Sequence, residues 1–194
     1  TNMQHSQKQS GFALLMALLV VGVVVSVGLS ILDLSIKQVR LSSNAKESEL
    51  AFHAANAGME CARYWRRDQS NRIERGLSIS PICFGESASN YSRTIVSSNA
   101  NAAVYQYEYE FTWGSGTQRR CTSINTIVAS TSPNGAGVTI AIGGLVAGYP
   151  GGLTATKVCE AGSRCSTVSV QGYNLPCSNK GGYGIVQREV LLEF

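Results

Sequence analysis

The hydrophobic pattern of this chain begins with one long apolar run. Residues 12–32 (FALLMALLVVGVVVSVGLSIL) include no charged side chain, and their only hydroxyl groups belong to Ser26 and Ser30. A helix of this length rises by about 30 Å, which matches the hydrocarbon core of a bilayer. The sequence therefore predicts a transmembrane helix over residues 12–32.

The helical pattern continues beyond the apolar run as an amphipathic stem over residues 33–68. Small and large apolar side chains recur there at steps of three and four residues, which places them on one helix face. The expected buried stripe consists of Leu34, Leu41, Ala45, Ser48, Phe52, Ala55, Met59 and Ala62. We expect its core contacts with a sheet to come from Leu41, Phe52, Ala55 and Met59.

The rest of the chain, residues 69–194, is predicted to form one globular β-rich head. In residues 104–113 aromatic and polar side chains alternate, so one aromatic strand face is expected to cover the stem. Turn signals separate further strands expected at residues 121–130, 138–142, 166–170 and 185–194. Residues 76–103, rich in Ser and Asn, predict a long loop. The fold class is α+β, with a long N-terminal helix packed on an antiparallel sheet like the stick of a lollipop.

The cysteines indicate disulfides in an oxidising compartment, because all six follow the apolar run. Cys61 is expected to be a separate case because it lies on the stem. The disulfide candidates are Cys83, Cys121, Cys159, Cys165 and Cys177. Six cysteines allow fifteen pairings, and all of them stay open. Zinc is disfavoured by the absence of a Cys-x-x-Cys pair and by the distance of both histidines from the cysteine-rich end. We expect no metal and no other cofactor.

Five arginines gather around two aromatic residues near the end of the stem. One interpretation is a surface for single-stranded nucleic acid. The other, which we favour, is that these cations complement the helix C-terminus while Trp65 turns into the core. The formal charge of +4 is too small to decide the question alone. The cluster comprises Arg63, Arg66, Arg67, Arg72 and Arg75 around Tyr64 and Trp65.

No catalytic constellation is visible in the sequence. His53 lies on the stem, and residues 69–194 contain no histidine, so a Ser-His pair cannot form within the head. The phosphate-loop motif GxxxxGK[ST] is absent as well. Glu108 and Glu110 share one strand face, where we expect them to be solvated rather than a paired acid and base. We expect no enzymatic activity.

The N-terminus resembles the class III signal of type IV prepilins. Residues 1–11 are short and polar, and Gly11-Phe12 directly precedes the apolar helix. In that family a dedicated peptidase cuts after the glycine and methylates the new N-terminal phenylalanine. The resemblance thus implies a leader over residues 1–11, with cleavage and methylation at Gly11 and Phe12. A cleaved Sec signal is the alternative, although the run is longer than a typical signal core.

Two further stretches support the resemblance, and two features depart from it. Residues 49–65 (ELAFHAANAGMECARYW) resemble the stem of prepilin-like minor subunits, and the loops around Cys159, Cys165 and Cys177 resemble the stapled C-terminal region of pilins, which often carries recognition. Family members usually have glutamate where this chain has Met16. Many also have a proline in the stem, whereas the first proline of this chain is Pro81. The methionine argues for a minor subunit rather than an abundant one.

The resemblance implies a pilin-like, minor subunit that other subunits contact through the N-terminal helix. Gly22 and Ser26, spaced four apart, would permit close helix approach, while Gly22 and Gly28 are weak points in the helix. The expected location is the cytoplasmic membrane, with the C-terminal domain outside, and then a surface filament. The alternatives are a secretion-system pseudopilin and a signal-anchored surface binding module that never polymerises.

Overall fold

The computed structural model describes residues 10–194, and most of the expected leader, residues 1–9, lies outside this range. One helix, α1 (Ser10–Asp68), runs without interruption for 59 residues. The chain divides into two compact units, one ending at Lys46 and the other spanning Glu47–Phe194. We call the second the head unit. The expected continuity between apolar run and stem is confirmed.

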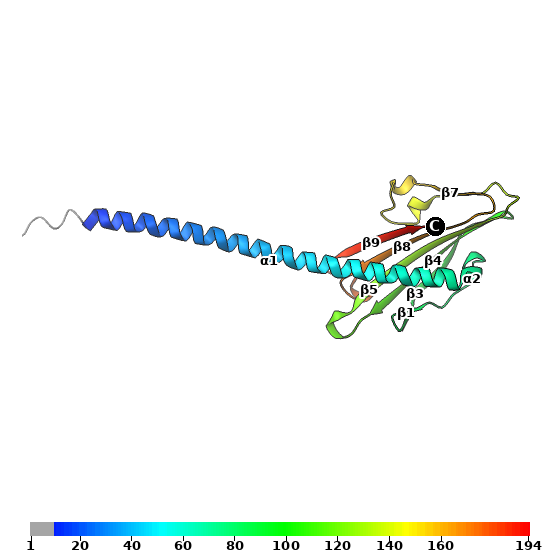
Figure 1. Ribbon diagram of the computed structural model, residues 1–194, viewed down its shortest axis with the longest axis horizontal. Coiled ribbons are helices and arrows are strands. Elements are labelled where there is room, and N and C mark those ends of the chain that lie inside the picture. The colour runs from blue at the N-terminus through cyan, green and yellow to red at the C-terminus, as the bar shows by residue number, and fades with distance from the viewer. Residues whose placement is uncertain (1–9) are drawn as a thin grey trace, which may run out of the picture. The chain divides into compact units, whose positions relative to one another are not determined.

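The head unit holds a five-stranded antiparallel sheet with the strand order β3-β4-β5-β8-β9 (Figure 1). The expectation of an α+β fold with the long helix packed on an antiparallel sheet is confirmed. The strands of this sheet are β3 (Ser89–Ser98), β4 (Ala102–Trp113), β5 (Arg120–Thr131), β8 (Arg164–Tyr173) and β9 (Gln187–Glu193).

Short elements complete the head unit. Helix α2 (Ser70–Glu74) follows α1 directly, and two small hairpins flank the main sheet. The hairpins are β1 (Ile82–Cys83) with β2 (Glu86–Ser87), and β6 (Val138–Ile140) with β7 (Lys157–Cys159). Single 3-10 turns occupy Gly116–Gln118, Ile142–Gly144, Gly152–Thr154 and Cys177–Asn179.

The loop expected over residues 76–103 is wrong in its second half, which forms β3. This strand lies at the edge of the sheet, and most of its side chains are exposed or half-buried. An edge strand that packs little on either face needs no alternation of apolar and polar residues. The strand expected at residues 166–170 is longer than predicted, and the strand expected at residues 138–142 ends at Ile140.

The two faces of the sheet bury different partners. On one face, alternate aromatic residues of β4, Tyr107, Tyr109 and Phe111, pack with Met59 and Ala62 of α1, as the period-two pattern predicts. The cyan to turquoise part of α1 lies along this face in Figure 1. The opposite face is covered at one end by residues 138–159, which we call the lobe. Its contacts with the sheet join Ile140, Ile142, Val146 and Cys159 to Val104, Ile127 and Ala129.

Candidate functional site

The apolar segment, residues 12–32, is the largest unpartnered hydrophobic surface among the described residues. Its large side chains are exposed, from Phe12 at 66% to Leu32 at 61%. Within residues 10–194, α1 is the one helix long and apolar enough to cross a membrane, and a signal sequence would share these properties. Exposed apolar patches of this size mark contacts with a membrane or with other proteins.

The few polar groups of this part of the helix are satisfied by the helix itself. The hydroxyl of Ser26 donates to the carbonyl oxygen of Val23, and that of Ser30 donates to Ser26, both at 2.9 Å. Such internal pairing suits an apolar medium, where an unpaired hydroxyl is costly. Nothing lies within 4 Å of a Cβ built on Gly22 or Gly28. These glycines are therefore open to a partner, as the predicted packing requires.

The expected cleavage site lies in the first turn of α1. The helix starts at Ser10, so the bond between Gly11 and Phe12 is helical in this structure. A Cβ built on Gly11 has open space around it. Met16, at the position usually held by glutamate, is 47% exposed, and residues 12–32 contain no carboxylate that would replace one.

The stem meets the sheet through small residues. Ala51, Ala54, Ala55 and Gly58 are buried, together with Met59 and Ala62. A Cβ built on Gly58 would lie 2.1 Å from Cγ2 of Thr122 and 2.7 Å from Cγ1 of Val170. The two layers are thus close enough that glycine is required at the contact. The sequence signal that could have located it is the run AANAG.

Two of the expected stem core residues are wrong. Leu41 is 71% exposed and lies before the head unit begins, and Phe52 is 48% exposed. The buried face instead follows Ala51, Ala54 and Ala55 because only small side chains fit against the sheet at this distance. Ala55 and Met59 are buried, as expected.

Polar contacts tie both ends of the head's helical part to the sheet. At one end Nδ2 of Asn174 donates to Oε2 of Glu47 at 2.9 Å, and Nε of Arg188 donates to Oγ of Ser48 at 2.7 Å. At the other end Nε of the buried Arg66 donates to Oγ of Ser166 in β8 at 2.8 Å. The stem is thereby fixed in rotation as well as in position.

All six cysteines form disulfides, which confirms the expectation of an oxidised head. The pairs are Cys61–Cys83, Cys121–Cys177 and Cys159–Cys165. Cys61 is not the separate case that the sequence suggested, because the β1-β2 hairpin brings Cys83 back to the stem. Each bond fixes a different part of the head: the hairpin, the loop after β8 and the lobe.

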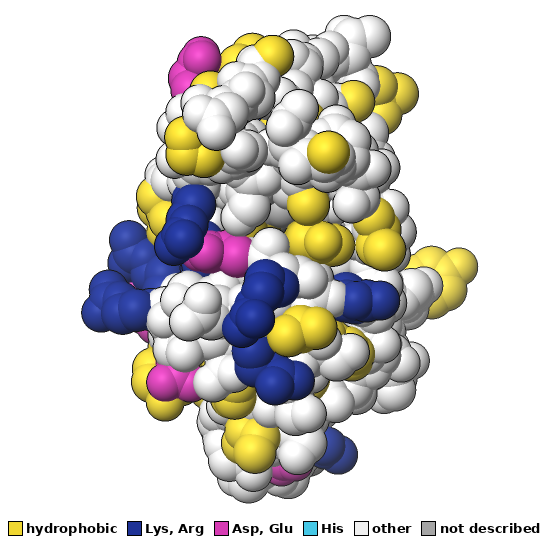
Figure 2. Space-filling view, turned by 90° about the vertical axis from the view of Figure 1, so that its right-hand side faces the viewer, with side chains coloured by type: hydrophobic (Ala, Val, Ile, Leu, Met, Phe, Trp, Pro, Cys, Tyr) yellow, Lys and Arg dark blue, Asp and Glu magenta, His cyan; other side chains and the backbone are white. Residues whose placement is uncertain are grey.

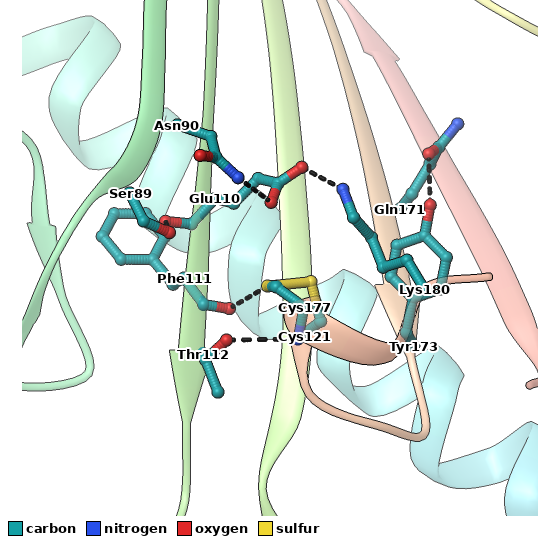
Figure 3. Close-up of polar contacts among 10 residues, drawn as sticks. All are labelled: Ser89, Asn90, Glu110, Phe111, Thr112, Cys121, Gln171, Tyr173, Cys177 and Lys180. Carbon is teal, nitrogen blue, oxygen red and sulfur yellow. Dashed lines mark hydrogen bonds and ion pairs between the residues drawn. A yellow bond between two sulfur atoms is a disulfide. The ribbon is translucent and has the colours of Figure 1, made fainter. Parts of the chain in front are cut away.

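The loop after β8 is held on the sheet by the Cys121–Cys177 bond and by Lys180 (Figure 3). Lys180 pairs with Glu110 of β4, which also accepts a hydrogen bond from Nδ2 of Asn90 at 3.0 Å. Glu110 is therefore buried and paired rather than solvated, contrary to expectation. Burial raises the pKa of the neighbouring Tyr173, and the charge of Glu110 adds to this effect.

The lobe is held over the sheet by a second polar cluster. The hydroxyl of Tyr149 donates to Oε1 of Glu193 at 2.5 Å, and Nζ of Lys157 lies 3.3 Å from Oε2 of the same carboxylate. The bond from Tyr149 holds the pKa of Glu193 below its ordinary value, and the charge of Lys157 adds to it. The amide of Asn125 fixes the lobe further through the carbonyl oxygen of Leu145 at 2.8 Å.

One group of metal-ligand residue types occurs among residues 10–194, formed by Glu110, Cys121 and Cys177. The two sulfur atoms are bonded to each other, so neither offers a thiolate to an ion. The carboxylate of Glu110 is already paired with Lys180. These three residues therefore serve to attach the loop after β8 to the sheet rather than to hold a metal ion.

The arginine cluster separates into two sets in the structure. Arg63 pairs with Glu60 at 3.0 Å, and the buried Arg66 bonds Glu74 and Ser166. Trp65 packs against the core and donates its indole N–H to the carbonyl oxygen of Ile82 at 3.2 Å, as the structural interpretation predicts. The second set, Arg67, Arg72 and Arg75, is exposed.

No family model, no curated protein and no solved structure matches this chain. The basis for a function is therefore the apolar helix, its attachment to the sheet and the stapled loops of the head.

Proposed function

We propose that this chain is a type IV pilin-like subunit, anchored in the membrane by the apolar segment until it enters an extracellular filament. The observation that carries the proposal is the continuity of α1. One helix contains both an apolar segment without partners in this chain and a stem packed on a disulfide-stapled sheet. The fold is compatible with a pilin.

The physical reason for assembly lies in what the apolar segment can contact. In a bilayer its side chains are covered by lipid, and no charged group within residues 12–32 opposes insertion. Outside the bilayer the same side chains need another apolar surface, and a second copy or a related subunit supplies one. The internally bonded Ser26 and Ser30 are compatible with both environments.

The N-terminus of the mature protein tests the proposal. We expect a mass that starts at Phe12 and carries one added methyl group, with the whole apolar segment retained. An N-terminus downstream of Ser26 would instead indicate an ordinary secretory signal. An uncut chain would indicate a signal-anchored module that does not polymerise.

A variant sharpens the same experiment. Gly11→Val has open space for its side chain, so the helix itself should tolerate it. If a prepilin-type peptidase cuts after Gly11, this variant should accumulate uncut. The matched control is Ala17→Val, which introduces the same side chain at the sixth residue after the bond and should be processed normally. Equal processing of both variants would contradict the proposed cleavage.

A further inference from the structure

Four exposed arginines lie together at the end of the head unit where α1 finishes. Arg67 belongs to the last turn of α1, Arg72 and Arg75 to α2 and its C-terminal cap, and Arg93 to β3. We call them the arginine surface. Figure 2 views this end of the molecule and shows Lys and Arg side chains gathered across it. The sequence did not indicate Arg93, because it lies eighteen positions after Arg75.

None of these four arginines takes part in an ion pair among the described residues. The nearest candidate carboxylate in α2, Glu74, is shared between Arg66 and Arg164, at 3.0 and 3.1 Å. Asp68 accepts a hydrogen bond from Gln69 at 2.7 Å. The amide of Gln69 is neutral, so Asp68 keeps its negative charge, but four arginines against this one carboxylate still leave the arginine surface with a net positive charge.

Backbone carbonyl groups hold three of the four guanidinium groups in place. Arg72 donates to the carbonyl oxygen of Ser78 from Nε at 3.2 Å and from Nη2 at 2.8 Å. Nε of Arg75 donates to the carbonyl oxygen of Asn71 at 3.0 Å, and Arg93 donates to that of Gly76. Each guanidinium has five N–H donors, so every one of them retains donors for a ligand.

The segment that supplies these carbonyl groups is itself fixed to the sheet. The buried hydroxyl of Tyr107 lies 3.1 Å from the carbonyl oxygens of both Ile73 and Leu77. The backbone N–H of Ile79 donates to the hydroxyl of Tyr91 at 3.1 Å. The arginines are thus oriented before a ligand arrives, which lowers the entropy lost on binding.

Arginine without lysine on this surface favours phosphate as the ligand, because the guanidinium fork matches phosphate oxygens. A single exposed ion pair contributes little, so useful affinity requires one ligand with many phosphates. Stacking on Trp65 is not the basis, since Trp65 is committed to the core, and Tyr64 is the exposed aromatic residue beside it. We propose that the arginine surface binds the phosphate backbone of nucleic acid, without reading its sequence.

Binding of a fluorescent DNA duplex to the full chain in an uncharged detergent tests this proposal. The logarithm of the binding constant should fall linearly with the logarithm of the salt concentration, with about 0.9 in slope for each phosphate contact. Arg72→Gln combined with Arg75→Gln should flatten the slope by about 2, so that between about 50 and 200 mM salt the variant loses roughly tenfold less affinity than the wild type. Arg67→Gln should flatten it by about 1, and the side chain of Arg67 makes no hydrogen bond among the described residues that the substitution would disturb.

The matched control removes two positive charges elsewhere in the head. Arg119 directly precedes β5 and Arg120 begins this strand, and Arg119→Gln combined with Arg120→Gln should leave the salt slope unchanged. Thermal unfolding and the absence of free thiols check that every variant is folded. If Arg72→Gln with Arg75→Gln does not fold, the slopes of Arg67→Gln and of the control still decide.

Four outcomes would overturn the proposal. They are no binding of the duplex at low salt, equal slopes for the two double variants, tighter binding of oligothymidylate than of duplex, and competition by polyglutamate as strong as by unlabelled duplex. The third would indicate base stacking, and the fourth would indicate a general acidic polymer. None of these results depends on whether the chain assembles into a filament.

Discussion

Gly172 of β8 lies directly against the backbone of the stem, so that a Cβ added to it would come within 2.2 Å of the carbonyl oxygen of Ala51. The same Cβ would lie 2.2 Å from the backbone nitrogen of Ala55. Backbone atoms cannot rotate away as a side chain can. The distance between the sheet and α1 is therefore set by a glycine on one side and by alanines on the other.

Gly172→Ala should destabilise the head, because the strand must move away from the helix. Overpacking of this kind costs about 1–3 kcal/mol. Denaturant unfolding followed by the fluorescence of Trp65 and Trp113 measures the change. Gly144→Ala is the control, since a Cβ there has nothing within 4 Å, and it should change the free energy of unfolding by less than about 0.5 kcal/mol. Equal stability of the two variants would contradict the close contact.

Thr122→Val should also weaken the attachment of the stem. The hydroxyl of Thr122 donates to the carbonyl oxygen of Ala54 at 3.1 Å and accepts the indole N–H of Trp113 at 2.9 Å. Valine keeps the shape but leaves the indole N–H unpaired, at a cost of about 1–3 kcal/mol. Thr94→Val on the exposed part of β3 is the control and should be nearly neutral. A neutral Thr122→Val would show that the hydroxyl contributes nothing.

The three disulfides should differ in what they contribute to stability. Their sequence separations are 22 for Cys61–Cys83, 56 for Cys121–Cys177 and 6 for Cys159–Cys165. The chain-entropy model gives about 3, 4 and 2 kcal/mol respectively. Replacing each pair by alanine and measuring thermal unfolding should reproduce this order. Thiol labelling of the native, exported protein should find no free cysteine, and five or six reactive thiols would contradict the oxidised head.

Stability should decrease above pH 10 because of Tyr107. Burial raises the pKa of Tyr107 from its ordinary value of 10.0 to about 12. The pKa of Tyr107 is higher in the folded state than in the unfolded state, so its contribution to the free energy of unfolding is complete below pH 10. This contribution is lost between about pH 10 and 12, to a total of about 3 kcal/mol. Tyr107→Phe removes this group, so the difference in unfolding free energy between wild type and variant should shrink over that interval. A constant difference would contradict the assignment.

If the chain is a pilin-like subunit, Met16 should make it a minor one. In type IV pilins, which this chain resembles, glutamate at this position is thought to pair with the N-terminal amine of a neighbouring subunit. A carboxylate in a bilayer is costly unless it has a partner, and methionine cannot accept from that amine. Quantifying the subunits of sheared surface filaments tests the assignment. A filament composed mainly of this chain would show that Met16 does not prevent it from being the main subunit.

The sequence by itself determined the features that depend on local periodicity and length. The apolar run, the continuous helix and the aromatic alternation of β4 each extend over ten residues or more. Patterns of this length predict the element from its own sequence, whatever the element contacts. The position of the cysteines after the apolar run was likewise enough to predict oxidation, though not the partners.

Only the tertiary structure decided which parts of the chain meet. The buried stem face follows Ala51 and Ala54 rather than Leu41 and Phe52, because the fit of two backbones at Gly172 admits only small side chains. Cys61 bonds to Cys83 because the hairpin of β1 and β2, whose strands have two residues each, places Cys83 beside the stem. Strands this short have no periodicity that the sequence could reveal. The arginine surface likewise exists because β3 returns Arg93 to the carbonyl group of Gly76, a contact between residues seventeen positions apart. Such contacts depend on the packing of separate elements, which no local pattern records.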